Sequence, residues 1–303
     1  MYILDPDPYL LPAYRISPFM TADLSRNHSL PDSDLIDEYF NERFPDRSFI
    51  YTKNGRQAMD MALSSFNLQK EDVVTILTTS GNFYISSCVT GTIEKHCRWS
   101  REFNERTRMI FVNHEFGHPY PGLKEIKDHH LPIIEDCASS FFSRDRKNEI
   151  GNTGDYVIFS FPKMFPVQIG GLLVANHQGG KELEADLGRE ELRHIRNVLS
   201  SQIDRKEWII QKRISNYNYL RDRFASLGFT ERFQLDPGTV PGVFMFSTTG
   251  KGIDLPRLRT HFSAHGIQSG VFYKEEAFFI PVHQALTEQD LDYFLLVFKS
   301  FIQ

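Results

Sequence analysis

Continuous apolar runs between residues 73 and 176 constrain the fold of this chain more than any other feature. Each run has the length of one strand, and helix-like stretches lie between several of them. Unbroken apolar character is typical of strands buried on both faces, and alternation with helices favours a mostly parallel sheet covered by helices. Ligands bind such sheets beyond the carboxyl ends of the strands. The runs are 73–77, 108–113, 132–136, 155–161 and 170–176.

The segment before these runs predicts an arm, a helix and a further strand. The first thirty residues are rich in proline and polar residues, which indicates an extended arm, and the periodic stretch that follows predicts a helix beginning near Asp32. Residues 48–52 are aromatic and β-branched, and apolar positions recur with helical spacing over residues 56–66. We therefore expect a strand, a turn and a helix here.

The composition changes after Asn176 and divides the chain. The charged stretch 181–223 has helical periodicity, indicates an exposed helix face, and is closed by Gly228 as a C-cap. Short strands and helices follow, and Thr287 with Asp290 forms an acidic capping box for the last helix. We expect a large domain over residues 1–180 and a smaller α+β domain over residues 181–303.

The overall composition excludes several classes of protein. The chain has 303 residues, 41% of them hydrophobic, and a net charge of −5 with no long basic block, which argues against a nucleic-acid surface. Its three cysteines lack CxxC spacing, which indicates a reducing compartment rather than a disulfide framework. The first residues lack the pattern of a signal peptide, and no apolar run approaches the roughly 18 residues of a membrane helix. We expect a cytoplasmic protein.

The turn Asn54-Gly55-Arg56 lies between the predicted strand and helix. A helix N-terminus exposes free N–H groups, and a glycine there lets an anion approach, so the turn could bind a phosphate group. A glycine that serves only the geometry of the turn is the alternative.

Asp136 ends an apolar run and is followed by small residues. A carboxylate at the carboxyl end of a strand, with room above it, could hold a protonated ring nitrogen of a flat ligand. The alternative is an aspartate that caps a helix. Glu135 is adjacent, and we expect the two side chains to point to opposite faces of the sheet.

Lys163 follows a predicted strand and precedes a second strand that opens at Gly170 and Gly171. An amine held among apolar neighbours can become nucleophilic toward an aldehyde. A lone lysine is more often a solvated charge, so this interpretation depends on its combination with the acid and the phosphate turn.

The order of these segments resembles that of the DegT-type sugar aminotransferases, which are enzymes of the aspartate aminotransferase fold that depend on pyridoxal 5'-phosphate (PLP). The resemblance extends from about Ser48 to the C-terminus, and it implies an α/β fold with a large PLP-binding domain and a smaller C-terminal α+β domain. Four segments carry it: TKNGRQAMDMAL, VNHEFGHPYPGLKEI, IIEDCASSF and YKEEAFFIPVHQALTEQDLDYFLLVF.

The resemblance implies a role for each matching residue. Lys163 would form the internal aldimine with PLP, and Asp136 would pair with the pyridinium nitrogen. Phe83 matches the aromatic residue that stacks on the pyridine ring, with Tyr84 as a substitute, and Ser139 would touch the ring hydroxyl. The residues that would hold the phosphate are Asn54, Gly55, Arg56 and Ser160.

Three histidines are weaker candidates. His114 and His118 could line the substrate side, and their spacing is no metal signal because a glycine and a proline break any helix there. His283 could equally serve packing or lie near the cofactor. We expect no metal.

The resemblance implies an aminotransferase that moves an amino group, from glutamate, to a nucleotide-linked keto-sugar for polysaccharide biosynthesis. It also implies a homodimer whose partner chains complete each active site. A PLP-dependent sugar dehydratase or lyase is one alternative, although such relatives lack the lysine. A non-catalytic binding scaffold is another, because Ser160 and Lys163 are two residues closer than in the family pattern and the chain is short for the family.

Overall fold

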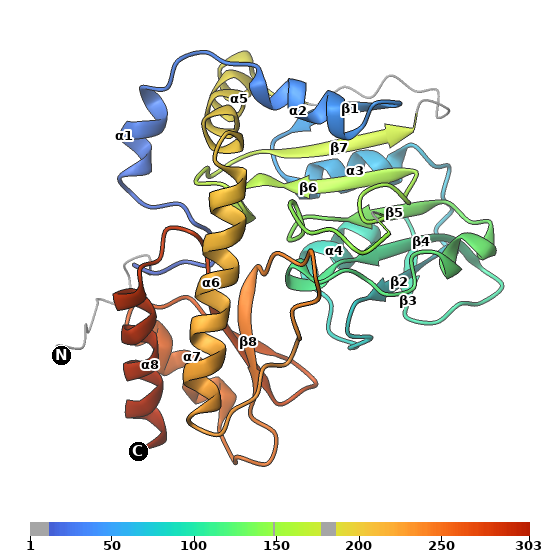
Figure 1. Cartoon of the computed structure of the whole chain (residues 1–303). Coiled ribbons are helices and arrows are strands. Elements are labelled where there is room, and N and C mark those ends of the chain that lie inside the picture. Colours follow the sequence, from blue (N-terminus) through green and yellow to red (C-terminus); the bar gives the residue numbers. More distant parts are fainter. Residues whose placement is uncertain (1–11, 148, 177–185) are drawn as a thin grey trace.

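The computed structural model describes residues 12–147, 149–176 and 186–303, and it contains a seven-stranded sheet in the order β1-β7-β6-β5-β4-β2-β3 (Figure 1). The β2–β3, β2–β4, β4–β5 and β5–β6 pairs are parallel, and β7 pairs antiparallel with β1 and β6. The predicted mostly parallel sheet is therefore confirmed. The strands are β1 (Arg47–Thr52), β2 (Val73–Thr78), β3 (Arg98–Ser100), β4 (Thr107–Asn113), β5 (Ile133–Asp136), β6 (Tyr156–Ser160) and β7 (Gly171–Asn176).

Helices cover both faces of this sheet. On one face, α3 (Gly55–Ser64) and α4 (Ser87–Ile93) pack over a core that includes Ile134. On the other face, α2 (Leu35–Arg43) and α5 (Arg189–Ile203) pack over a core that includes Ile133. The unbroken apolar runs of the sequence arise because successive side chains of each strand enter opposite cores.

The C-terminal part forms a smaller unit around a second core. Its antiparallel sheet has the order β8-β10-β9, and aromatic side chains such as Phe224, Phe246 and Phe298 pack between that sheet and its helices. The predicted capping box is present, because Asp290 N donates to Thr287 Oγ1 at 3.3 Å and Thr287 N donates to Asp290 Oδ2 at 2.8 Å. The elements are α6 (Lys206–Ala225), β8 (Val243–Ser247), α7 (Leu255–Ala264), β9 (Gly270–Phe272), β10 (Ala277–Pro281) and α8 (Glu288–Ile302).

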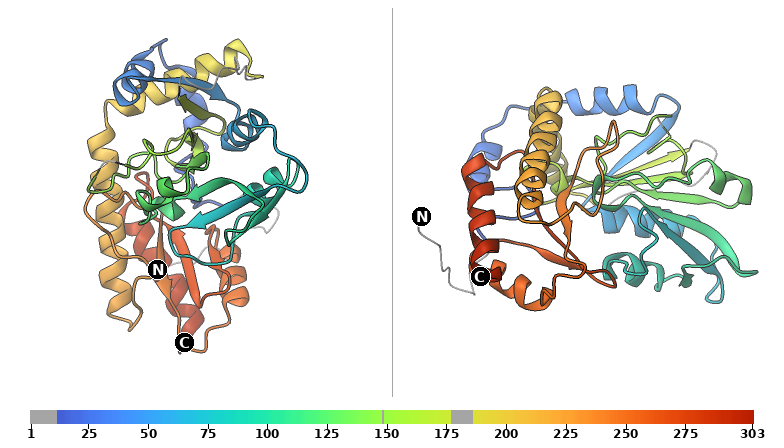
Figure 2. Two further views of the ribbon diagram at one scale, coloured as in Figure 1. Left: turned by 90° about the vertical axis from the view of Figure 1, so that its right-hand side faces the viewer. Right: turned by 60° about the horizontal axis from the view of Figure 1, so that its bottom comes forward.

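Helix α6 joins the two cores. Ile209, near its start, belongs to the core under α2 and α5, whereas Tyr217 and later residues belong to the core of the smaller unit. The helix runs from beside α5 into the smaller unit (Figure 1), which lies beside the large sheet (Figure 2). The predicted domain boundary at residue 180 therefore does not coincide with the division of the cores, which falls within α6.

Several details of the sequence prediction need correction. The predicted extended arm contains a short helix, α1 (Asp23–His28), and its residues 1–11 lie outside the described residues. The helix expected near Asp32 begins at Leu35. The charged stretch expected to be an exposed helix face begins with residues 181–185, which are outside the described part, and it includes the fully buried Arg213. Among the described residues, no helix combines the length and apolar character that a membrane span needs.

Candidate active site

A cleft of about 450 Å³ opens at the carboxyl edge of the parallel strands. Asn113, Asp136 and Ser160, which are the last residues of β4, β5 and β6, all line it. They meet because the carboxyl ends of parallel strands lie at the same edge of a sheet, and the volume is within the roughly 300–1,000 Å³ of small-molecule sites. Phe272 of β9 also lines the cleft, so the smaller unit contributes one wall.

The turn before α3 points the N-terminus of that helix at the cleft. The Asn54 side chain accepts a hydrogen bond from Gln57 N at 2.9 Å and so caps the helix. A Cβ atom on Gly55 would lie 3.1 Å from Ser160 Cβ, so the turn is pressed against the end of β6. The N–H groups of Gly55 and Arg56 and the positive end of the helix dipole therefore form an anion-binding corner beside Ser160.

Asp136 and Glu135 point to opposite faces of the sheet, as the alternation of a strand requires. Asp136 lines the cleft, and its Oδ1 accepts a hydrogen bond from Ala138 N at 2.9 Å. That bond closes a local turn rather than capping a helix, and the carboxylate remains at the cleft. Asp136 is thus placed to hold a protonated ring nitrogen.

Lys163 lies in the same cleft despite its short distance in sequence from Ser160. A 3₁₀ turn, η3 (Phe161–Lys163), follows β6 directly and brings the lysine to the edge of the sheet. Its Nζ donates to Ser139 Oγ at 3.3 Å. The structure therefore brings together Lys163, Ser139 and Asp136, with the anion-binding corner at α3 lining the same cleft.

These donors and acceptors fit PLP. The phosphate group needs an anion site, the aldehyde needs an amine, and the pyridine nitrogen needs a carboxylate. The helix N-terminus at Gly55, the amine of Lys163 and the carboxylate of Asp136 supply one of each within a single cleft.

The predicted stacking residue lies elsewhere. Phe83 is 62% exposed, its ring is 6.3 Å from the Trp99 ring, and it is not among the residues that line the cleft. Tyr84, the substitute, does line the cleft, and its ring is 5.2 Å from the Tyr273 ring. A loop residue's direction depends on its local turn, which the sequence pattern did not fix.

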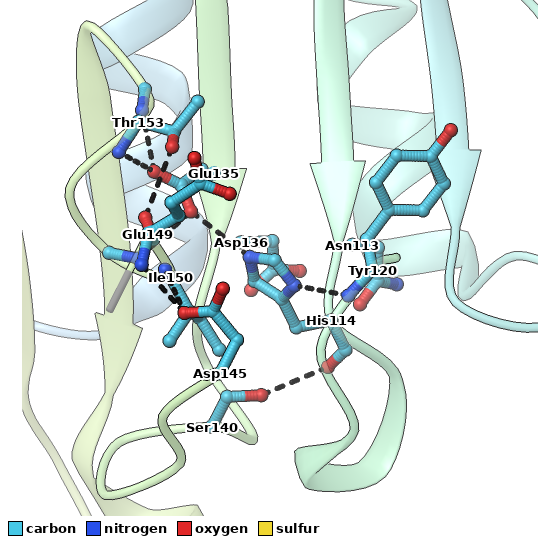
Figure 3. Close-up of polar contacts among 12 residues, drawn as sticks. Asn113, His114, Tyr120, Glu135, Asp136, Ser140, Asp145, Glu149, Ile150 and Thr153 are labelled. Carbon is cyan, nitrogen blue, oxygen red and sulfur yellow. Dashed lines mark hydrogen bonds and ion pairs between the residues drawn. The ribbon is translucent and has the colours of Figure 1, made fainter. Parts of the chain in front are cut away.

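The three histidines do not line the cleft. His114 is fully buried, its Nδ1 accepts from Tyr120 N at 2.9 Å, and its Nε2 lies 3.1 Å from Glu135 Oε2 (Figure 3). Because Nδ1 accepts a hydrogen bond, Nε2 carries the ring proton, and the Nε2–H group donates a hydrogen bond to Glu135 Oε2. Burial lowers the pKa of His118, which stacks on Phe233, to about 4, and burial lowers the pKa of His283 to about 3.

The His114–Glu135 pair secures the loop between β5 and β6. The Glu135 carboxylate accepts the N–H groups of Gly151 (2.9 Å), Thr153 (2.7 Å) and Gly154 (2.5 Å) (Figure 3). Complete burial opposes its charge, yet the hydrogen bonds from His114 and the backbone hold the pKa of the Glu135 carboxyl below its ordinary value. These two side chains therefore stabilise the strand that carries Asp136 rather than contact a ligand.

Two titratable residues of the cleft, Cys88 and Glu115, were not predicted from the sequence. The Cys88 thiol accepts a hydrogen bond from Arg56 Nη2 at 2.9 Å. Partial burial raises the pKa of the thiol, but the hydrogen bonds from Arg56 and Ser86 and the charges of Arg56 and Lys163 outweigh it, so the net effect is a lowered pKa. Glu115 accepts from Ser80 N, and burial raises the pKa of its carboxyl. Neither is the last residue of a strand, so no sequence signal marked them.

Comparisons with known proteins identify similar sequences and a shared fold. Residues 97–186 match the model of the DegT/DnrJ/EryC1/StrS aminotransferase family. Over an alignment of 163 positions the chain is 26% identical to GDP-perosamine synthase of Escherichia coli O157:H7, and the alignment covers 45% of this chain and 44% of that relative. The chain thus spans less than half of the length of this curated relative.

Two solved structures share the fold over nearly the whole chain. The PLP form of the putative sugar aminotransferase Spr1654 from Streptococcus pneumoniae superimposes with a TM-score of 0.73 at 12% identity, covering 99% of each chain. The E. coli GDP-4-keto-6-deoxy-D-mannose-3-dehydratase with bound hydrated PLP gives a TM-score of 0.68 at 13% identity, covering 95% of this chain and 100% of that one.

The predicted resemblance to the DegT-type sugar aminotransferases is confirmed by the match of residues 97–186. The predicted α/β fold of PLP-dependent aminotransferases is confirmed by the structural neighbours. The match agrees with the predicted enzyme class and cofactor, because the aminotransferases of that family depend on PLP.

Proposed function

We propose that this chain is a PLP-dependent aminotransferase that moves an amino group from glutamate to a nucleotide-linked keto-sugar. The observation that carries the proposal is the convergence of Lys163, Asp136 and the N-terminus of α3 on one cleft. Relatives named for sugar amination and for a GDP-linked sugar support the substrate class.

The residues of the cleft have separate tasks in this reaction. When bound, PLP supplies a ring that withdraws electrons from the substrate carbon. Asp136 keeps the ring nitrogen protonated through its carboxylate. Lys163 would hold the aldehyde group of the cofactor through Nζ, and its free amine would take up the proton that leaves the substrate carbon. Ser139, which accepts a hydrogen bond from Nζ, orients that amine.

The anion-binding corner would hold the phosphate end of the cofactor, so that the rest of the cofactor lies beside Asp136, Lys163 and Ser139. The N–H groups of Gly55 and Arg56 and the hydroxyl of Ser160 bind the phosphate, with Asn54 holding the first turn of α3 in place. Tyr84, on the loop before α4, lines the cleft and would contact the cofactor ring. The phosphate corner and the Asp136 carboxylate would hold the cofactor at two points of the cleft that Lys163 also lines.

We further propose a cytoplasmic homodimer, with partner chains completing each site, that acts in polysaccharide biosynthesis. The free thiols of Cys88, Cys97 and Cys137 support a reducing compartment. The dimer and the pathway follow from the family resemblance.

Sugar dehydration is a second candidate, because the fold is also that of a PLP-binding sugar dehydratase. The presence of Lys163 in the cleft favours amination, since the PLP-dependent sugar dehydratases related to the DegT-type family lack the lysine that binds PLP. A non-catalytic scaffold loses support because the short Ser160–Lys163 spacing still places the lysine in the cleft.

One isotope experiment separates these functions. The protein is incubated with PLP, ¹⁵N-glutamate and GDP-4-keto-6-deoxy-mannose, and the sugar product is analysed by mass spectrometry. Amination gives a ¹⁵N-labelled amino sugar that is absent with the Lys163→Ala variant. Loss of a sugar hydroxyl without nitrogen in the product indicates a dehydratase. If the protein converts neither this sugar nor other nucleotide-linked keto-sugars, the proposed function is wrong.

A further inference from the structure

Arg213 of α6 is a charged side chain in the protein interior, with no exposed surface. Its guanidinium donates to neutral acceptors: Nε to Gln284 Oε1 (2.8 Å), Nη1 to Pro241 O (3.2 Å), and Nη2 to Lys163 O (3.1 Å) and Met164 O (3.5 Å). Burial lowers its pKa to about 9, and no carboxylate of the described residues offsets that effect. Burying a charge without a counter-ion costs free energy, so the hydrogen bonds of Arg213 must offset that cost.

The acceptors belong to separate parts of the chain. Lys163 and Met164 end the turn that carries the cleft lysine, Pro241 precedes β8, and Gln284 lies between β10 and α8. Carbonyl oxygens at the end of a short helical turn have no partner within it. The planar guanidinium reaches several of them at once, which a single ammonium group does not.

Gln284 completes a second link to the same turn. Its side-chain oxygen accepts from Arg213, and its Nε2 donates to Met164 O at 2.9 Å. Gln284 is itself buried. The backbone of the lysine turn is therefore held from the C-terminal unit at two adjacent carbonyls, while the Lys163 amine is held by Ser139 at its other end.

We propose that Arg213, together with Gln284, positions Lys163 by holding the carbonyl oxygens of residues 163 and 164. This inference rests on the proposed function, in which Lys163 is the amine that meets the cofactor aldehyde. Arg213 is a positioning residue, because it acts on the backbone of the turn and not on the cofactor. These carbonyl contacts hold the short turn that links Ser160 to Lys163.

The test compares variants in the full-length protein. Arg213→Gln and Gln284→Leu remove the contacts to the turn, and Arg213→Lys keeps the charge without the planar fork. Asn216→Ala is the matched control: Asn216 lies one turn further along α6, is buried, and donates to the carbonyls of Val282 and His283 without contacting the lysine turn.

Two readouts report on Lys163. The first is the rate at which added PLP is captured at Lys163, trapped with borohydride and located by mass spectrometry. The second is the labelling of Lys163 by acetic anhydride without PLP, relative to the exposed Lys124. Because a displacement of about 1 Å can cost up to about a hundredfold in a positioned reaction, we expect Arg213→Gln and Gln284→Leu to slow capture at least about tenfold. We also expect both to change the relative labelling of Lys163.

Each outcome decides the proposal. Asn216→Ala should leave both readouts close to those of the unmodified protein, even if it lowers thermal stability. The positioning role would be overturned by any of three results: PLP capture slowed equally in all variants, capture unchanged in Arg213→Gln, or full capture in Arg213→Lys. If the unmodified protein captures no PLP, the proposed function fails. The relative labelling of Lys163 in Arg213→Gln then still decides whether Arg213 positions the lysine.

Discussion

Replacing Gly171 by alanine should displace the phosphate turn. Gly171 opens β7, and a Cβ atom there would lie 2.7 Å from Asn54 C and from Phe159 O and 2.8 Å from Gly55 N. Carbon contacts in proteins are about 3.5–4 Å, so either β7 or the turn must move by about 1 Å. The obstructing atoms are backbone, which no side-chain rotation can relieve.

The expected cost has two components. Overpacking of this kind lowers the free energy of unfolding by about 1–3 kcal/mol. A shift of about 1 Å in the N–H groups that hold the phosphate should also weaken PLP binding at least about tenfold, because those hydrogen bonds depend steeply on distance. Denaturant titration measures the first quantity, and a titration of PLP absorbance measures the second.

Gly91→Ala is the matched control for Gly171→Ala. Gly91 lies within α4, and nothing is within 4 Å of the position that its Cβ would take. Alanine there should leave PLP affinity unchanged and raise helix stability by up to about 1 kcal/mol. A Gly171→Ala protein with the stability and PLP affinity of the unmodified chain would refute the argument that β7 supports the phosphate turn.

Two further predictions concern buried and reactive groups. Because burial holds the pKa of His118 near 4 against 6.5 for the free side chain, the unfolded state binds more protons between those values, and stability should fall as the pH drops from 6.5 to 4. His118→Phe keeps a ring stacked on Phe233 and should make the free energy of unfolding less dependent on pH between 4 and 6.5, by up to about 1.4 kcal/mol per pH unit. An unchanged pH dependence would contradict this prediction for His118. Iodoacetamide should alkylate Cys88 faster than the buried Cys97, and bound PLP should slow this reaction. Equal rates for both thiols by peptide mass spectrometry would show that Cys88 is not activated.

The sequence predicted the sheet well because strands buried on both faces leave an unbroken apolar run. The short β3 and the strand β10 were not predicted. β3 has only three residues, and the β10 segment was interpreted as a family motif rather than by its apolar pattern. The helix within the arm was missed because α1 has only six residues and weak apolar periodicity.

The candidate site was predictable where a residue's position follows from a strand end. Asp136 and the turn at Gly55 lie where the end of β5 and the start of α3 require, and both line the cleft. Phe83 and the histidines lie on loops, whose side-chain directions depend on contacts distant in sequence. His114 illustrates this, since it follows the end of β4 and its partner Glu135 lies on β5.

Arg213 was missed for a different reason. In a charged helical sequence an arginine normally indicates a solvated face. Its burial depends on carbonyls contributed by residues 28 to 50 positions away in sequence, which no local pattern reveals.

The absorption spectrum of the protein with PLP, followed by borohydride reduction and peptide mapping, tests whether Lys163 is the amine that binds the cofactor. We expect the visible absorption band of a lysine–PLP adduct and, after reduction, a cofactor label on Lys163. The Lys163→Ala variant should lack the label, whereas Lys124→Ala, a change at an exposed lysine outside the cleft, should retain it. A label on another lysine, or no adduct in the unmodified protein, would contradict the assignment of Lys163 as the amine that binds the cofactor.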